Sequence, residues 1–462
     1  MTTILESIVA DKKVWVAQAK QSFPLEGFKN DIQLSDRDFY SALFATKVLR
    51  KNAFILECKK ASPSKGLIRE DFDVAEIAHT YAPYATITSV LTDTKYFGGD
   101  FEFLQMAKSA THTPILCKDF FIDAYQVYLA RYKGGDGILL MLSVLDDDTY
   151  TALSDLAHSM NMGVLTEVSN EVEAKRASAL GAKIIGINNR NLHDLTTDLD
   201  RTQVLRSHLP SEAFVVSESG IYTFNDTLKL RPFCDAYLVG SSVMAQDNID
   251  LACRALTLGT NKVCGLRSAN DAKIAYENGA MFGGIILVST SKRFVDIDTA
   301  KEIMRASPLT CIGVFQNESV SHVVATVKEL KLTFVQLHGD EDDNYIGLFK
   351  KHLSDVFVFK AVSIDISDDS FPSVPNKADG YILDSKVGTQ SGGTGVKFNW
   401  DIIPNAIKGK SLLSGGIGID QIPEALKVGC LGLDMNSKLE NSNAEKQKDL
   451  IENAFQRIQI KN

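Results

Sequence analysis

The sequence predicts an α/β protein built from two consecutive (β/α)8 barrels, and three observations support this prediction. Short apolar runs rich in Val, Ile and Leu recur about every 25 residues along the chain. The runs are continuous rather than alternating, and stretches between them, such as Asp123–Tyr132 and Asn170–Leu180, have helical periodicity. Continuous apolar strands separated by helices indicate a parallel sheet that is covered by helices. Eight such units in about 200 residues match the count and size of one closed barrel.

The first half of the chain contains eight of these runs. They lie at Phe54–Leu56, Ile87–Leu91, Pro114–Cys117, Gly137–Leu142, Gly163–Leu165, Ile184–Ile187, Phe214–Val216 and Tyr237–Val239. Residues 1–50 precede the first run and have helical character. We therefore expect an N-terminal helical extension that packs onto the first barrel.

The second half contains eight more runs, so the count begins again. They lie at Lys262–Cys264, Gly284–Val288, Cys311–Phe315, Phe334–Leu337, Val356–Lys360, Tyr381–Leu383, Leu412–Leu413 and Leu431–Met435. The segment Leu256–Asn261 has a glycine and few apolar residues, so we expect domains at 1–255 and 256–462. A doubly wound sheet would also alternate strands and helices, but two sets of eight units favour paired TIM barrels.

The composition narrows the class of protein. Hydrophobic residues make up 45% and charged residues 23%, which is a globular balance. No apolar run reaches the roughly 18 residues that a membrane-spanning helix requires, and the early charges Glu6, Asp11 and Lys12 disfavour a secretory signal. Seven singly placed cysteines without a CxxC pair favour reduced thiols, so we expect a cytoplasmic protein.

Charge and histidine spacing exclude further classes of partner. The formal net charge of −9 disfavours nucleic acid and anionic membranes as partners. The eight histidines show no ligand spacing such as HExxH, so we expect no metal. Anionic substrates would have to be held by local cations and backbone amides, because the overall field repels them.

Polar residues close the apolar runs of the first half. In barrel enzymes the catalytic residues lie at the carboxyl ends of the strands. A buried charge there is costly unless it is paired or used, so for any one residue a structural ion pair at the rim is an equal alternative. Ionisable groups at several different strand ends favour one shared site. The residues are Glu57, Lys59, Lys118, Asp119, Glu167, Asn188, Glu218 and Ser219.

Small residues follow the last two runs of each half. They are Ser219-Gly220 and Gly240-Ser241-Ser242 in the first half, and Ser414-Gly415-Gly416 and Asn436-Ser437 in the second. Such pairs also form ordinary turns. However, the loops after strands seven and eight are the usual phosphate site of a barrel, where small residues let backbone amides approach the ligand. Their recurrence predicts that each half binds a phosphate ester.

The other strand ends of the second half carry Cys264, His338, Lys360 and Asp384. A lone cysteine is usually an inert buried hydrophobe. A cysteine at the end of the first strand with an acid across the barrel mouth is nevertheless a candidate acid–base pair. After Asp384 comes Gly388–Gly395 (GTQSGGTG), which is either a plain loop or, as we favour, a lid over the substrate.

With these residues identified, the first half resembles indole-3-glycerol-phosphate synthase over nearly its full length. The motifs are Ile55–Gly66 (ILECKKASPSKG), Pro114–Asp119 (PILCKD), Leu165–Val168 (LTEV), Gly186–Asn191 (GINNRN), Val216–Ile221 (VSESGI) and Leu238–Ser242 (LVGSS). The second half resembles phosphoribosylanthranilate isomerase through Lys262–Leu266 (KVCGL), Val314–Phe315, Val335–Asp340 (VQLHGD), Asp384 with its glycine-rich loop, and Gly432–Glu440 (GLDMNSKLE). Together these motifs are highly specific.

The resemblance of the first half implies roles in closing an indole ring with loss of CO₂ and water. It implies that Lys118 is the general acid and Glu167 the partner acid/base in dehydration. It further implies that Glu57 and Asn188 position the lysine and the substrate hydroxyls, and that Lys59 holds anionic groups of the substrate. The remaining substrate-binding positions, mostly for phosphate, match Ser62, Arg190, Ser219, Gly220, Gly240 and Ser241.

The resemblance of the second half implies an Amadori rearrangement. Cys264 matches the general base that takes the C2′ proton, and Asp384 matches the general acid that protonates the ring oxygen. A thiol is a base near neutral pH only as thiolate, so we expect a nearby dipole or cation to lower its pKa. Arg293 matches the partner of the anthranilate carboxylate. The other expected substrate-binding residues are His338, Gly415, Gly416, Asn436 and Ser437.

Several positions near the second site depart from the isomerase pattern. They are Arg267, Lys292, Ser414 and Lys438, where Thr, Pro, Ala and Gly are common. These departures motivate an alternative in which the second barrel is a degenerate scaffold. A pair of barrels acting like histidine-pathway sugar isomerases is disfavoured, because those use paired aspartates. We expect no cofactor, phosphorylated small molecules as partners, and a monomer.

Overall fold

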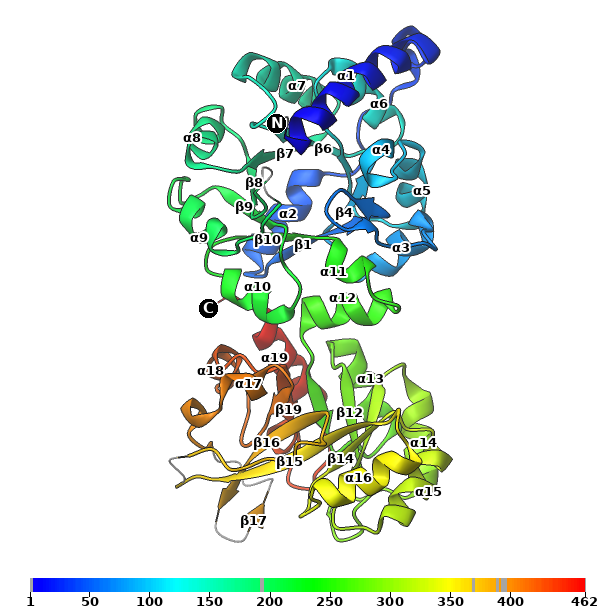
Figure 1. Ribbon diagram of the computed structural model, residues 1–462, viewed down its shortest axis with the longest axis vertical. Coiled ribbons are helices and arrows are strands. Elements are labelled where there is room, and N and C mark those ends of the chain that lie inside the picture. Colours follow the sequence, from blue (N-terminus) through cyan, green and yellow to red (C-terminus); the bar gives the residue numbers. More distant parts are fainter. Residues whose placement is uncertain (1–2, 192–194, 368–369, 388–389, 392–396, 462) are drawn as a thin grey trace. The chain divides into compact units, whose positions relative to one another are not determined.

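The computed structural model describes residues 3–191, 195–367, 370–387, 390–391 and 397–461. The chain divides into two compact units, one of residues 1–253 with Lys461 and one of residues 254–460 with Asn462. The division falls inside helix α12 (Ile249–Leu258) rather than in an irregular linker. Each unit is described by itself below (Figure 1).

The first unit is a closed barrel of eight parallel strands. Its order is β1-β10-β9-β8-β7-β6-β5-β4, and β1 closes the ring by pairing with both β10 and β4. The strands are β1 (Ala53–Cys58), β4 (Ile87–Leu91), β5 (Ile115–Lys118), β6 (Gly137–Met141), β7 (Gly163–Val168), β8 (Ile184–Asn188), β9 (Phe214–Glu218) and β10 (Ala236–Val239). A two-stranded antiparallel hairpin, β2 (Ala61–Ser62) with β3 (Gly66–Leu67), follows β1.

Helices alternate with these strands and surround them in Figure 1. Most begin where an Asp, Asn or Thr side chain accepts a hydrogen bond from the first turn, as Asp146 does for α7, and such caps fix where a helix starts. The helices are α3 (Val74–Tyr81), α4 (Thr94–Phe97), α5 (Glu102–Ala110), α6 (Ala124–Tyr132), α7 (Asp147–Ser159), α8 (Glu171–Ala179), α9 (Asp200–Arg206), α10 (Phe224–Leu230) and α11 (Ser241–Met244).

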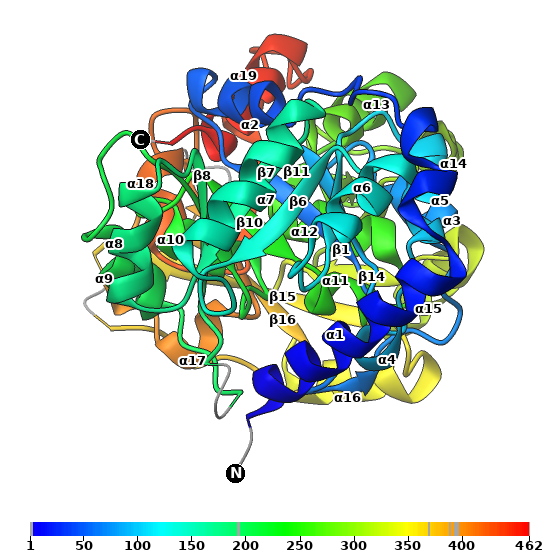
Figure 2. The same cartoon turned by 90° about the horizontal axis from the view of Figure 1, so that it is seen from above.

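Two further helices precede the first strand, α1 (Ile4–Ser22) and α2 (Phe39–Val48), with two short 3-10 turns between them (Leu25–Gly27 and Lys29–Asp31). Phe39 and Leu43 of α2 join the buried core that alternate strand residues build inside the barrel. Helix α1 runs along the side of α4 (Figure 2), where Lys95 bonds to Asp11 at 2.7 Å. Lys12 of α1 is buried and pairs with Asp93 and Asp119 at 2.7 and 2.6 Å, which ties α1 to two strand ends.

The second unit is also a closed barrel of eight parallel strands. Its order is β15-β14-β13-β12-β11-β19-β18-β16, and pairing of β15 with β16 closes it. The strands are β11 (Lys262–Cys264), β12 (Phe282–Ile286), β13 (Thr310–Phe315), β14 (Phe334–Leu337), β15 (Phe357–Asp365), β16 (Gly380–Val387), β18 (Ser411–Leu413) and β19 (Gly432–Met435). The short strand β17 (Gln390–Ser391) pairs antiparallel with the end of β16.

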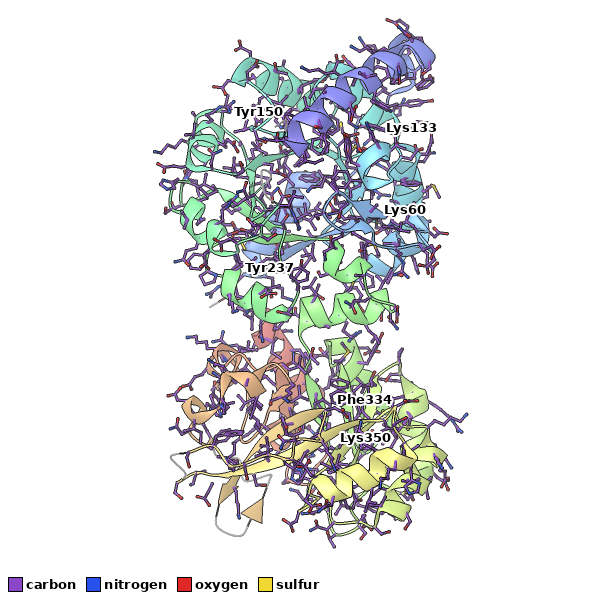
Figure 3. All side chains as sticks on the ribbon, viewed as in Figure 1. Lys60, Lys133, Tyr150, Tyr237, Phe334 and Lys350 are labelled. Atoms are coloured by element: carbon purple, nitrogen blue, oxygen red, sulfur yellow. The ribbon has the colours of Figure 1, made fainter. Side chains whose placement is uncertain are left out.

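The helices of the second unit are less regular than those of the first. No helix is present in the described residues between β15 and β16. An aromatic cluster of Phe282, Phe334 and Phe359, with Phe334 labelled in Figure 3, fills part of the interior. The helices are α13 (Ala269–Asn278), α14 (Ile297–Ala306), α15 (Val320–Leu330), α16 (Asp343–His352), α17 (Asn405–Lys408), α18 (Ile422–Lys427) and α19 (Lys448–Gln459), with 3-10 turns η3 (Trp400–Ile402) and η4 (Ser437–Leu439).

The predicted fold of two consecutive (β/α)8 barrels is confirmed, since each of the sixteen apolar runs overlaps a barrel strand. Strand β12 is shifted as a whole by two residues, because it begins at Phe282 and not at the predicted Gly284 and ends at Ile286. Strand β15 continues to Asp365, five residues beyond its predicted end at Lys360. The candidate lid Gly388–Gly395 lies outside the described residues, apart from Gln390–Ser391.

Candidate active sites

A cavity of about 160 Å³ opens at the carboxyl ends of the strands in the first barrel. Its wall includes every residue of the first half to which the resemblance assigns a catalytic or substrate-binding role. Apolar side chains of Ile4, Leu5 and Ile8 from α1 also line it, so the N-terminal extension contributes to the wall. The nominated residues in the wall are Glu57, Lys59, Ser62, Lys118, Glu167, Asn188, Arg190, Ser219, Gly220, Gly240 and Ser241.

Lys118 at the end of β5 faces a cluster of carboxylates. Its Nζ lies 3.1 Å from Glu218 Oε2 and 3.7 Å from Glu57 Oε2. Burial works against the ammonium form, but Glu218, Glu57 and Glu167 outweigh that penalty and raise the pKa of Lys118. The lysine therefore carries its proton at neutral pH, as a general acid must.

Glu57 is held by two lysines. Its Oε1 lies 2.6 Å from Lys59 Nζ. Burial raises the pKa of this carboxyl, but the charges of Lys59 and Lys118 outweigh burial and the net pKa is lowered. Lys59, which the resemblance nominates for holding anionic groups, is thus partly neutralised by an internal carboxylate.

Glu167 on β7 differs from Glu57, because the pKa of its carboxyl is raised and not lowered. Burial, and then the charge of Glu218, raise its pKa to about 7, while Lys118 and a hydrogen bond from Asn188 lower it. Asn188 Nδ2 donates to Glu167 Oε1 at 3.1 Å. A carboxyl that titrates near neutral pH can both donate and accept a proton during one turnover.

Small residues shape the other side of this cavity. Ser219 has φ 69°, a left-handed conformation that a non-glycine residue adopts at a cost of about 1–3 kcal/mol. A Cβ on Gly240 would lie 2.8 Å from Glu57 Oε1 and 3.0 Å from Glu57 Cβ, so any side chain here would have to displace Glu57. Arg190 is half-buried, and its Nη1 donates to Leu195 O at 3.0 Å.

Cys264 and Asp384 end up inside the second barrel, on β11 and β16, with β19 and β18 between them. Cys264 is 5% exposed. Burial raises the pKa of its thiol, and although Lys262 and Lys446 lower it, the net pKa is above the usual value. The expected cation is present, but the expectation of a lowered pKa is wrong, because removing the thiolate from water outweighs the two lysines.

Asp384 is also buried. Burial, and then the charge of Asp434, raise its pKa to about 7. Its Oδ1 accepts the backbone N–H of Ser385 at 2.8 Å, a bond that works in the opposite direction. This carboxyl therefore holds a proton up to neutral pH, which suits a general acid.

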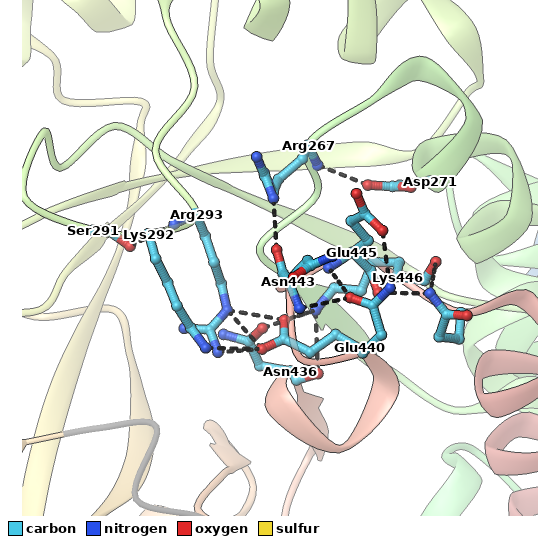
Figure 4. A network of polar contacts seen from close by, with 12 residues as sticks. Arg267, Asp271, Ser291, Lys292, Arg293, Asn436, Glu440, Asn443, Glu445 and Lys446 are labelled. Atoms are coloured by element: carbon cyan, nitrogen blue, oxygen red, sulfur yellow. Dashed lines mark hydrogen bonds and ion pairs between the residues drawn. The ribbon is translucent and has the colours of Figure 1, made fainter.

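Arg293, nominated for the substrate carboxylate, is engaged with a carboxylate of the chain (Figure 4). Its guanidinium binds both oxygens of Glu440, with Nε 2.9 Å from Oε2. Lys446 Nζ binds the same Oε2 at 3.1 Å and Asn436 Oδ1 at 2.8 Å. The network thus connects the arginine to the loop after β19.

The remaining nominated residues of the second half lie at neighbouring strand ends. His338 Nδ1 accepts a hydrogen bond from Gln336 Nε2 at 3.0 Å, and burial, with Lys262 and Lys360, lowers the pKa of His338 to about 4, so it is neutral. A Cβ on Gly415 would lie 2.8 Å from the hydroxyl of Ser385, so the backbone at Gly415 runs close beside β16. Asn436 and Ser437 form the turn from β19 into η4.

The four departures from the isomerase pattern lie at the rim or in turns. Arg267 donates from Nη1 to Asn443 O at 3.0 Å, and Lys292 lies 3.8 Å from Glu440 Oε1 (Figure 4). Ser414 is buried, and its N–H bonds to Leu383 O. Lys438 is exposed beside Gly418. Neither Cys264 nor Asp384 is displaced from the barrel interior by these residues.

The structure adds charged residues that sequence reasoning missed. Glu218 was noticed at a strand end, but its bond to Lys118 was not foreseen. Lys262 and Asp434 lie within runs that the sequence analysis treats as apolar strands. Glu440 and Lys446 lie in the loop that follows the last strand. A charged residue inside an apolar run is the signal that could have identified Lys262 and Asp434, because a buried charge needs a partner.

The described residues contain neither a metal-binding cluster nor a membrane-spanning helix. No group of three or more His, Cys, Asp or Glu residues there is arranged to hold a metal ion. Among the helices described, none combines the length and the apolar character needed to cross a membrane.

Comparison with known proteins agrees with this geometry. The family model of indole-3-glycerol phosphate synthase matches residues 5–256, and that of N-(5′-phosphoribosyl)anthranilate isomerase matches residues 261–457. The tryptophan biosynthesis protein TrpCF of Vibrio parahaemolyticus is 50% identical over 99% of this chain and 94% of its own length. TrpCF of Haemophilus influenzae is 48% identical over 99% of this chain and 97% of its own length.

These matches span both barrels, so the scaffold alternative for the second barrel is not favoured. The order of the matched domains, synthase before isomerase, is the one expected from the motifs. The chain belongs to the family of bifunctional tryptophan-biosynthesis enzymes that join indole-3-glycerol-phosphate synthase to phosphoribosylanthranilate isomerase.

Proposed function

We propose that each barrel works through one acid–base set, Lys118 with Glu167 in the synthase and Cys264 with Asp384 in the isomerase. The observation that supports this most strongly is the protonation of the acids. Buried Asp384 and Glu167 each have a pKa raised to about 7, and the pKa of Lys118 is raised by three carboxylates. Strongly perturbed groups at barrel strand ends are typical of catalytic residues.

In the isomerase, Asp384 protonates the ring oxygen of N-(5′-phosphoribosyl)anthranilate while the C1′–oxygen bond breaks. The resulting imine makes the C2′ proton acidic, and the Cys264 thiolate removes it. The enolamine that forms then tautomerises to 1-(2-carboxyphenylamino)-1-deoxyribulose 5-phosphate. Because the thiol pKa is raised and that of Asp384 is about 7, only a small fraction of the enzyme holds the thiolate–acid combination at any pH.

Binding at the second site uses charge at both ends of the substrate. We assign Arg293 to the anthranilate carboxylate, since a guanidinium can bind both carboxylate oxygens at once. The same guanidinium already makes this type of contact with Glu440. We assign the phosphate to the loops of Gly415–Gly416 and Asn436–Ser437, with His338 as a neutral contact near the strand ends.

In the synthase, Lys118 protonates the C2′ carbonyl oxygen while the aromatic carbon that bears the carboxylate attacks C2′. Loss of CO₂ follows, and then loss of water with Glu167 as the partner acid/base. Glu57 and Glu218 hold the ammonium of Lys118, and Asn188 orients Glu167. Positioned proton transfer contributes about 10²–10⁴-fold, so loss of Lys118 should be severe.

The phosphate of this substrate is assigned to the small-residue side of the cavity. Arg190, Ser219, Gly220, Gly240 and Ser241 all line it, and Ser62 lies in the wall after β1. Lys59 is shared between Glu57 and the anionic groups of the substrate. None of the proposed steps requires a redox cofactor, pyridoxal or a metal.

The domain limits, assembly and compartment are part of the proposal. Residues 1–255 would carry the synthase and 256–462 the isomerase, in a monomeric cytoplasmic enzyme that binds phosphorylated small molecules. All seven cysteines are buried, which suits a reducing compartment.

Exchange of Cys264 for alanine tests the assignment of the isomerase base. We expect C264A to lose isomerisation of phosphoribosylanthranilate and to keep indole formation from the ring-opened intermediate. The matched control is C311A, a buried cysteine on β13 outside the proposed machinery. Unchanged isomerisation by C264A would refute the assignment.

A further inference from the structure

A buried ion pair lies inside the second barrel, on the strands that carry the catalytic cysteine and its neighbour. Lys262 on β11 is 0% exposed, and its Nζ lies 2.8 Å from Asp434 Oδ2 on β19. The two residues are direct partners in the register of β11 and β19. A second acceptor, Gln336 Oε1 on β14, lies 2.8 Å from the same Nζ.

The cation of this pair lies beside Cys264. The two residues are separated by one position on β11, so their side chains lie on the same face of the strand, inside the barrel. A Cβ on Gly284 would lie 2.6 Å from Cys264 Sγ and 3.0 Å from Lys262 Cε, so both side chains pack over this glycine. The ammonium of Lys262 also lowers the pKa of the Cys264 thiol.

The anion of the pair lies on the side of Asp384. Around the barrel, β19 and β18 separate β11 from β16, so Asp434 lies between the cysteine and the aspartate. One of its oxygens, Oδ1, is buried and has no hydrogen-bond partner within the described residues. An unsatisfied buried carboxylate oxygen is costly, and a purely structural ion pair would gain nothing from leaving it bare.

We propose that Lys262 and Asp434 are positioning residues of the isomerisation, in which the ammonium favours Cys264 as thiolate and the bare carboxylate oxygen favours Asp384 as acid. This inference rests on the roles proposed above for Cys264 and Asp384. One buried dipole thereby promotes the two opposite protonation states that the reaction needs at once. Neither residue has to touch the substrate.

The electrostatic neighbours of the two catalytic groups support this arrangement. Burial raises the pKa of Cys264, Lys262 and Lys446 lower it, and Asp434 raises it. Burial and Asp434 raise the pKa of Asp384, while the N–H of Ser385 and Lys262 lower it. His338, which also faces Lys262, is neutral and adds no charge. Lys262 therefore favours the thiolate form of Cys264, and Asp434 favours the protonated form of Asp384. These are the two protonation states that the reaction requires.

Titration of the Cys264 thiol tests the inference without relying on catalysis. The difference in thiolate absorbance between each protein and its C264S counterpart isolates this one thiol from the other six cysteines. We expect K262M to raise the midpoint of the thiol by about one to three pH units, because an adjacent cation is lost. We expect D434N to lower the midpoint, because Lys262 would then have the thiolate as its only anionic partner.

Opposite shifts from the two variants are a signature that general damage to the barrel cannot produce. Thermal unfolding and the circular dichroism of each variant establish that the barrel is folded. The double variant K262M/D434N, which leaves no unpaired charge, keeps the test valid if a single variant does not fold, and its thiol should titrate higher than in the unmodified chain. An unchanged midpoint in folded K262M, or equal shifts in K262M and D434N, would overturn the inference.

Kinetics of the same variants separate this inference from the proposed roles. If Cys264 is not the base, C264A stays active whatever the thiol titration shows. If it is the base, we expect the acid limb of the kcat/KM profile to move to lower pH in D434N, because Asp384 loses its neighbouring negative charge. An acid limb that does not move in D434N would contradict the part assigned to Asp434.

Discussion

The guanidinium of Arg293 binds both carboxylate oxygens of Glu440, at 2.9 Å from Nε to Oε2 and 3.2 Å from Nε to Oε1. Lys446 binds the same carboxylate from the other side at 3.1 Å. The residue proposed to hold the carboxylate of the substrate is therefore oriented by a carboxylate of the chain (Figure 4). Binding of substrate then adds an anion to an arginine that is already in place.

The role of Arg293 in substrate binding can be tested with one variant that removes its charge and one that keeps the charge but lacks the guanidinium group. We expect both R293M and R293K to raise KM for phosphoribosylanthranilate by about 10- to 100-fold, because a lysine cannot form the two parallel hydrogen bonds of a guanidinium. Steady-state kinetics measure this, and indole formation from the ring-opened intermediate is the internal control. A normal KM in R293K would show that charge alone is enough.

Glu440 is expected to matter for the stability of the second barrel. Its side chain is 3% exposed between Arg293 and Lys446, and removal of one partner of such a buried pair costs about 3 kcal/mol or more. Urea unfolding of E440Q measures this loss, and E445Q on the same exposed loop is the matched control. Equal stability of the two variants would contradict the prediction.

The same residue predicts how stability depends on pH. Burial raises the pKa of Glu440, but Arg293 and Lys446 outweigh burial and the net pKa is lowered. The stabilisation is therefore complete above the pKa of the unfolded chain, 4.5, and is lost as the pH falls through the lower pKa of the folded chain. We expect E440Q to lose less stability than the unmodified chain on acidification below this pH.

The pH profile of kcat/KM for the isomerase should have its acid limb near neutral pH. Below about pH 7, Asp384 is already protonated, and the thiolate of Cys264 becomes scarcer with each step down in pH. Above that pH the gain in thiolate is balanced by the loss of the acid, so kcat/KM should be level until the raised pKa of the thiol is passed. A level profile that extends down to about pH 4 would show that Asp384 has an ordinary carboxyl pKa.

The synthase should respond to loss of the Asn188 amide. This amide donates to Glu167, and the hydrogen bond favours the ionised carboxylate. Its removal in N188A should raise the pKa of Glu167 further above 7, so the limb of the synthase profile near neutral pH should move to higher pH. N188A with an unmoved limb and a lower kcat would mean that Asn188 acts on the substrate and not on Glu167.

The fold and most of the first site could be predicted from sequence because the signal is local. Continuous apolar runs define strands, and Lys118 or Glu167 can be placed at a strand end without knowledge of any other residue. The offset in β12 has a physical reason as well: Phe282–Gly284 are as buried as Ile285–Ile286, but two glycines weakened the apolar pattern there.

What could not be predicted depends on partners distant in sequence. The pairing of Lys262 with Asp434, 172 residues away, only becomes visible when β11 and β19 are adjacent. The sign of the pKa change at Cys264 depends on the balance between burial and two lysines, and motif spacing contains neither quantity. Arg293 was found by resemblance, but its contact with Glu440 was not.

The most direct test of the two-site assignment is to give purified, chelator-treated chain phosphoribosylanthranilate and to follow its fluorescence and indole-glycerol phosphate together. We predict full conversion by the unmodified chain, and accumulation of the ring-opened intermediate by K118M, in which only the synthase acid is lost. Loss of fluorescence without indole product in the unmodified chain would contradict an active first barrel. Failure to consume the substrate, with indole formed from added intermediate, would contradict an active second barrel.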